Sequence, residues 1–115
     1  MKLDELLQTI KKLNESLINR HPQLQVDHDK QVLARVAKVS EEYGELVDEI
    51  LSSLNLQRDD KLSQYDRTNL SLEFVDVFIT LLLLGDTLDI NMKKAIELRL
   101  KDMYQKFGPV NDRHQ

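Results

Sequence analysis

The chain has no cysteine among its 115 residues. This absence excludes a disulfide scaffold, a zinc site with thiolate ligands and a cysteine nucleophile. Tryptophan is also absent, and only three glycines and two prolines occur. Because glycine and proline mark tight turns and breaks between strands, their scarcity favours long helices over a β architecture. We therefore expect an all-α fold.

Basic residues are in the minority, since 16 Lys and Arg stand against 20 Asp and Glu. A nucleic-acid interface usually needs a basic face, so we expect no nucleic-acid partner. The segment Met1–Glu5 is acidic where a secretory signal peptide carries positive charge, so we expect a cytoplasmic protein. A chain of this length buries only about two-thirds of its unfolded surface, and for this reason we expect it to form an oligomer.

Apolar residues recur at steps of three and four along most of the chain, as they do along one face of a helix. We expect one domain, 1–115, with its core over about 30–107 and a frayed tail over 110–115. Asp27 and Asp29 are candidate N-caps of the second helix, and Gly108-Pro109 is a typical stop signal. In chain order, the predicted helices cover about 2–19, 27–54, 66–88 and 91–107.

The third predicted helix differs from the others. Between Leu70 and Leu88 its apolar side chains point in almost every direction, which predicts a central helix with protein on nearly all sides. Its apolar run Val77–Leu84 is far shorter than the roughly 20 residues of a membrane span, and Glu73 and Asp76 lie just before it. We therefore expect no membrane partner.

Glu73 and Asp76, with Thr80 and Thr87, are nearly the only polar groups of this helix, and they share one narrow angular window. An uncompensated buried carboxylate costs several kcal/mol, or its pKa shifts until the group is neutral. The window is therefore expected to face cations or hydrogen-bond donors.

The second predicted helix carries more acids. Glu42, Glu45 and Glu49 follow one flank of its apolar seam, while Glu41 and Asp48 point further towards water. If this flank faces the polar window of the third helix, four carboxylates converge and repel one another unless a divalent cation lies between them. Oxygen ligands alone select a hard ion such as Mg²⁺ or Mn²⁺.

Three simpler interpretations stay open at this point. Acidic pairs are common on solvated helix faces, and the helix dipole favours acids near a helix N-terminus such as that before Glu73. A nearby Arg35 or Arg67 that paired with Glu73 and Asp76 would also explain them, and it would favour a purely structural role.

The motif EEYGEL is followed, after 27 residues counted from Glu45, by EFVD. Together they resemble the E-x-x-E and E-x-x-D signature of the MazG-like, all-α nucleoside triphosphate pyrophosphohydrolases, over about residues 30–107. Lys38 and Gly44 fit the first motif. The resemblance implies a bundle of four or five helices that assembles as a homodimer or homotetramer. It maps four acids onto the family's Mg²⁺ ligands: Glu42, Glu45, Glu73 and Asp76.

The activity implied by the resemblance is hydrolysis of a nucleoside triphosphate to a monophosphate and pyrophosphate. Glu41 or Glu49 would be the catalytic acid that orients or deprotonates water, and Lys38 or Lys94 would bind the triphosphate. The last helix departs from the family's arrangement of basic residues, so the base and sugar preference is not implied. The alternatives are a non-catalytic helical oligomerisation or interaction module and a nucleotide sensor of the same fold.

Overall fold

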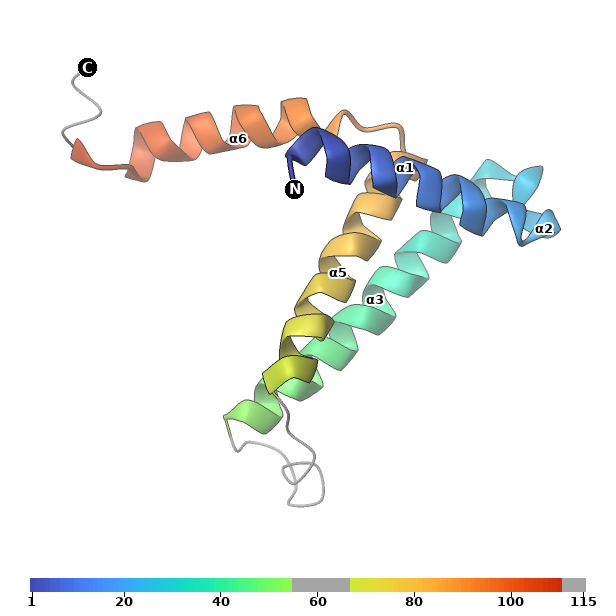
Figure 1. Cartoon of the computed structure of the whole chain (residues 1–115), viewed down its shortest axis with the longest axis horizontal. Coiled ribbons are helices and arrows are strands. Elements are labelled where there is room, and N and C mark those ends of the chain that lie inside the picture. The colour runs from blue at the N-terminus through green and yellow to red at the C-terminus, as the bar shows by residue number, and fades with distance from the viewer. Residues whose placement is uncertain (55–66, 111–115) are drawn as a thin grey trace.

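The computed structural model describes residues 1–54 and 67–110, which form helices joined by short connections (Figure 1). No strand occurs among these residues, which confirms the all-α prediction. Residues 55–66, which join the second and third predicted helices, and residues 111–115 of the predicted tail lie outside the described residues. The helices are α1 (Leu3–Asn19), α2 (Pro22–Gln25), α3 (His28–Ser53), α5 (Arg67–Thr87) and α6 (Met92–Phe107).

The helix boundaries follow the capping residues of the sequence. Asp27 is the N-cap of α3, and its side chain accepts a hydrogen bond from the backbone N–H of Lys30 at 3.2 Å. Asn91 caps α6 in the same way through the N–H of Lys94 at 3.1 Å. No helix was predicted for the connector after α1, but it contains the one-turn helix α2. Pro22 favours this turn because its missing N–H needs no partner at the start of a helix.

The antiparallel pair of α3 and α5 is the main element of the fold (Figure 1). α1 crosses this pair where α5 ends, and Ile10 of α1 packs there with Leu82 and Leu83 of α5. These three residues form the buried apolar cluster, so the core lies at one end of the helix pair.

A Schellman turn at the end of α5 directs α6 away from the helix pair. The N–H of Ile90 bonds to the carbonyl of Gly85 at 2.9 Å, and the N–H of Asp89 bonds to that of Asp86 at 3.0 Å. Asp89 has a φ of 58°, a left-handed conformation that Asp tolerates better than most residues. α6 consequently extends from the end of the helix pair and touches the other helices only near its own start (Figure 1).

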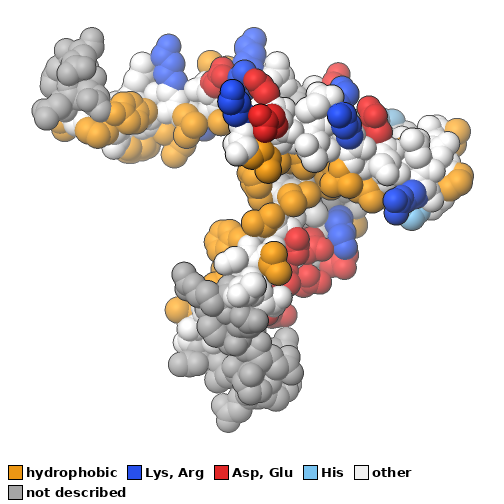
Figure 2. Space-filling model, in the orientation of Figure 1, with side chains coloured by type: hydrophobic (Ala, Val, Ile, Leu, Met, Phe, Trp, Pro, Cys, Tyr) orange, Lys and Arg blue, Asp and Glu red, His pale blue; other side chains and the backbone are white. Residues whose placement is uncertain are grey.

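The expectation that the third predicted helix has protein on nearly all sides is wrong for a single chain. One flank of α5 lies against α3 and its C-terminal end against α1, but the rest of its apolar surface is uncovered. α6 is also largely uncovered along one side (Figure 2). Half or nearly half exposed on α5 are Leu72, Phe74, Val75, Phe78 and Leu81, and on α6 are Leu98, Leu100, Met103, Tyr104 and Phe107.

Within the described residues, Thr68–Thr87 is long and apolar enough to span a membrane when judged by length and composition. The core helix of a soluble protein passes the same test. The prediction against a span counted only the run Val77–Leu84, so its length argument was too strict. Glu73 and Asp76 inside the helix remain the argument against a span.

Candidate metal centre

Three carboxylates meet where the middle of α3 faces the first half of α5. One ligand oxygen from each of Glu42, Glu73 and Asp76 can be chosen so that all three lie within 4.8 Å of one another. We call these three residues the acid cluster. Figure 2 shows red acidic side chains gathered on one flank of the helix pair. The antiparallel pairing of the helices therefore brings the two acidic motifs together.

The acid cluster is poorly satisfied by the protein itself. Glu42 is 9% exposed, and its Oε2 is buried without a hydrogen-bond partner, as is Oε2 of Glu73. Burial raises the pKa of Glu73 above its ordinary value, and the negative charges of Glu45, Asp76 and Glu42 raise it further. A buried acceptor without a partner costs about 1–3 kcal/mol, and more when it is charged. The cluster thus has the properties of a site that is completed by a cation or by protons.

Of the predicted metal ligands, Glu45 lies at the exposed edge of the cluster. It is close enough to Glu73 to raise the pKa of that carboxyl by charge and by a hydrogen bond, but it is not one of the three closest acids. Gly44 beside it has open space where a Cβ would lie. Nothing in the single chain therefore requires glycine at this position of the motif.

Lys38 is the cation that pairs with a carboxylate of the acid cluster in the described part of the chain. Its Nζ lies 3.2 Å from Glu42 Oε1 and 3.6 Å from Glu41 Oε1. Its hydrogen bond with Glu42, and then the charge of Glu41, raise the pKa of Lys38. Glu41 is well exposed and occupied by this pair, so of the two predicted catalytic acids it is the less enclosed.

Glu49, the other predicted catalytic acid, is partly buried one helical turn beyond Glu45. Its Oε1 accepts a hydrogen bond from Asn69 Nδ2 at 2.6 Å, and its Oε2 is buried without a partner. Asn69 was not among the predicted site residues. It precedes Glu73 by four residues and so lies on the same face of α5, a spacing that could have identified it.

Lys94 does not join the acid cluster within one chain. It follows the N-cap of α6, which starts beyond the C-terminal end of α5 (Figure 1). Glu73 and Thr87 are 14 positions apart in α5, a length of about 20 Å along the helix axis. The predicted contact between Lys94 and a triphosphate at the cluster would have to come from another copy of the chain.

The alternative in which Arg35 pairs with Glu73 and Asp76 is wrong. Arg35 donates to Asn14 Oδ1 from Nε at 3.0 Å and from Nη2 at 2.6 Å, near the other end of the helix pair. Asn14 Nδ2 in turn donates to Asp86 Oδ2 at 2.8 Å and to Thr87 Oγ1 at 3.1 Å. Among the residues with described side chains, which do not include Arg67, no Lys or Arg is ion-paired with Glu73 or Asp76.

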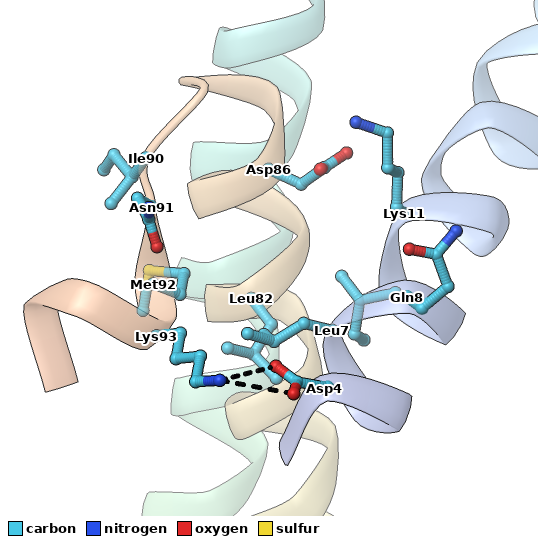
Figure 3. Close-up of a pocket in the computed structure, with 11 residues that line it drawn as sticks. Asp4, Leu7, Gln8, Lys11, Leu82, Asp86, Ile90, Asn91, Met92 and Lys93 are labelled. Carbon is cyan, nitrogen blue, oxygen red and sulfur yellow. Dashed lines mark hydrogen bonds and ion pairs between the residues drawn. The ribbon is translucent and has the colours of Figure 1, made fainter. Parts of the chain in front are cut away.

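A cavity of about 470 Å³ lies between α1, the end of α5 and the start of α6 (Figure 3). Leu7, Leu82 and Met92 contribute apolar wall, and Lys93 pairs with Asp4 at 3.2 Å on its rim. None of the predicted site residues lines this cavity. Asp4 and Lys93 are paired with each other and Asp86 accepts a hydrogen bond from Asn14, so the cavity has fewer unsatisfied acids than the acid cluster and is not taken as the candidate site.

Comparisons of the chain with protein-family models, with curated proteins and with solved structures found no match. The candidate centre therefore has to be judged by its own chemistry.

Proposed function

We propose that this protein is a Mg²⁺-dependent nucleoside triphosphate pyrophosphohydrolase of the MazG-like class. The observation that carries the proposal is the acid cluster, in which two of three converging carboxylates have a buried oxygen without a partner. Protein donors do not answer these oxygens, and oxygen ligands alone suit Mg²⁺ or Mn²⁺. Glu42, Glu73 and Asp76 would hold the ion, with Glu45 at the edge. A bound Mg²⁺ would supply charge neutralisation on the phosphate oxygens and a more acidic water.

Glu49 and Lys38, which lie near the acid cluster, have roles in this proposal that follow from their surroundings. Glu49, enclosed and with one free oxygen, is the base that accepts a proton as the water oxygen attacks the α-phosphorus. The bond from the α-phosphorus to the bridging oxygen then breaks, and pyrophosphate leaves. Lys38 lies beside Glu42 and would contact the triphosphate once Glu42 binds a metal ion.

The test is pyrophosphate release from a panel of nucleoside triphosphates with Mg²⁺ or Mn²⁺. We expect turnover that a chelator abolishes. Asp76→Asn and Glu45→Gln should each lower turnover by more than about 100-fold, because even the groups that merely support metal ligands are worth 10- to 100-fold. Glu15→Gln on the exposed face of α1 removes a carboxylate far from the cluster and should leave turnover unchanged.

The melting temperature separates the alternatives. Mg²⁺ should raise it in the wild type and not in Asp76→Asn, because an ion that binds only the folded state stabilises that state. A wild type with neither turnover nor a melting shift is the non-catalytic interaction module. A shift with metal and nucleotide but without turnover indicates the nucleotide sensor.

We further propose that the protein acts as a homodimer or homotetramer in the cytoplasm, without a nucleic-acid or membrane partner. The support is that a single chain buries few apolar side chains and exposes many. Its described residues bury only four apolar side chains, Ile10, Leu46, Leu82 and Leu83, while α5 and α6 leave contiguous apolar faces open. Large exposed patches of this kind mark interaction surfaces.

Sedimentation velocity tests the assembly. Phe78→Asp on α5 and Leu98→Asp on α6 should each lower the assembled mass, because a charge would be buried in an apolar interface. Val26→Asp is the matched control, since Val26 is 90% exposed and isolated from these faces. A wild type that sediments as a single chain contradicts the proposal.

A further inference from the structure

Only one of the two carboxylate oxygens of Glu49 has a hydrogen-bond partner among the described residues. Asn69 Nδ2 of α5 donates to Glu49 Oε1 of α3 at 2.6 Å, and both residues are partly buried. The second oxygen, Oε2, is buried and has no partner among the described residues. Asn69 is thus in contact with a carboxylate whose other half is left open.

This pair lies one helical turn from the acids of the proposed site. On α3, Glu49 follows Glu45 by four residues, and on α5, Asn69 precedes Glu73 by four. Because the two helices are antiparallel, the Asn69–Glu49 pair continues the row in which Glu45 approaches Glu73. The hydrogen bond therefore belongs to the same row of polar side chains between α3 and α5 and is not an isolated surface contact.

A neutral amide suits the task of orienting a base. A hydrogen bond to a carboxylate is stronger than one between neutral groups, so it restricts the rotamers of Glu49. Lysine or arginine at this position would also orient Glu49, but it would bring a positive charge that competes with a metal ion and lowers the basicity of the carboxylate. Asparagine fixes Oε1 and leaves the full negative charge of the group in place.

We infer that Asn69 is a positioning residue, which holds Glu49 by Oε1 so that Oε2 is free to accept the proton of the attacking water. This inference rests on the proposed function. It assigns to Asn69 no contact with substrate or metal, and it predicts an effect on the chemical step alone.

Asn69→Asp is the decisive variant, because it keeps the shape of the side chain and replaces the donor by an acceptor. We expect kcat for pyrophosphate release to fall about 10- to 100-fold, the usual effect of losing a supporting hydrogen bond in a metal site. The Mn²⁺ dissociation constant, measured by electron paramagnetic resonance, should not rise, because an added negative charge does not weaken cation binding. Asn69→Leu, which removes the donor without adding a charge, should lower kcat in the same way and leave the KM for nucleotide unchanged. Asn69→Gln, which retains the amide donor, should recover part of kcat. Asn19 is exposed on α1, away from the acid cluster. Asn19→Asp makes the same change there and should match the wild type.

Each other result overturns the inference in a recognisable way. Wild-type kcat in Asn69→Asp shows that Glu49 needs no positioning, and it leaves the proposed function standing. A loss of Mn²⁺ affinity as large as the loss of kcat shows that the pair holds metal instead of a base. A wild type that binds Mn²⁺ but releases no pyrophosphate from any nucleotide removes the proposed function and this inference together.

Discussion

Two polar clusters lie on the same helix pair, and they are satisfied to very different degrees. In the first, which we call the Asn14 junction, the amide of Asn14 makes four hydrogen bonds, with Arg35, Asp86 and Thr87. Asn14 is 3% exposed, yet every donor and acceptor site of its side chain is filled. In the acid cluster, by contrast, Glu42 and Glu73 each keep a buried oxygen without a partner.

The difference separates a structural network from a binding site. A fully satisfied buried network fixes how elements pack and has no capacity left for a ligand. The Asn14 junction joins α1, α3 and α5, and it contains one cation, Arg35, whose charge interacts with that of Asp86. The acid cluster has like charges and open acceptors, so it gains from a cation. Burial of polar residues alone would have selected both clusters, whereas unmet hydrogen bonds select only one.

The largest effect is expected from breaking the satisfied cluster. Asn14→Leu keeps the branched shape of the side chain but leaves the partly buried guanidinium of Arg35 and carboxylate of Asp86 without their hydrogen bonds to Asn14. We expect the free energy of unfolding to fall by about 3 kcal/mol, the order of magnitude for breaking a buried charged network. Urea denaturation monitored by circular dichroism measures it.

Asn19→Leu at the exposed end of α1 is the matched control and should change the unfolding free energy little. The acid cluster should respond with the opposite sign, because Asp76→Asn relieves repulsion and should stabilise the metal-free protein. If Asn14→Leu leaves stability unchanged, the junction is not the structural network described above.

The sequence predicted the acid cluster better than it predicted the Asn14 junction, for a physical reason. Glu73 and Asp76 stand out because they interrupt the most apolar helix of the chain, and an antiparallel neighbour with acids at helical spacing is bound to face them. Asn14 lies on an ordinary amphipathic helix, where an asparagine normally faces water. Its burial depends on how α1 crosses the pair, which no local pattern specifies.

The uncovered surface of α5 is a second feature that could not be predicted from the sequence. An apolar circumference predicts that the helix is covered, but it does not say by which chain. Leu72, Phe74 and Phe78 remain half exposed because one chain supplies α3 and α1 as the main neighbours of α5, and α6 meets it beside Gly85. The helix positions were predictable from periodicity and caps, whereas the path of α6 depends on the turn at Asp89.

A smaller effect distinguishes the two clusters by pH. Burial and neighbouring acids raise the pKa of Glu73 in the folded protein, whereas the unfolded chain has the ordinary value. Between these two values the folded state binds more protons, so the free energy of unfolding falls as pH rises through that window. Below the ordinary pKa the contribution of Glu73 to stability is complete, and above the raised pKa it is lost. Glu73→Gln cannot ionise, so in chelator it should lose this part of the pH dependence and melt higher than the wild type above the window.

Melting temperatures in chelator from about pH 4 to pH 8, a range that covers ordinary carboxyl titration, measure the difference between the two proteins. Glu15→Gln should follow the wild type throughout, because its carboxylate is exposed on α1. Adding Mg²⁺ at high pH should restore the stability of the wild type and not that of Glu73→Gln, since a cation then replaces the proton. Parallel melting curves for wild type and Glu73→Gln would mean that the open oxygens of the acid cluster carry no energetic penalty, and the contrast with the Asn14 junction would then disappear.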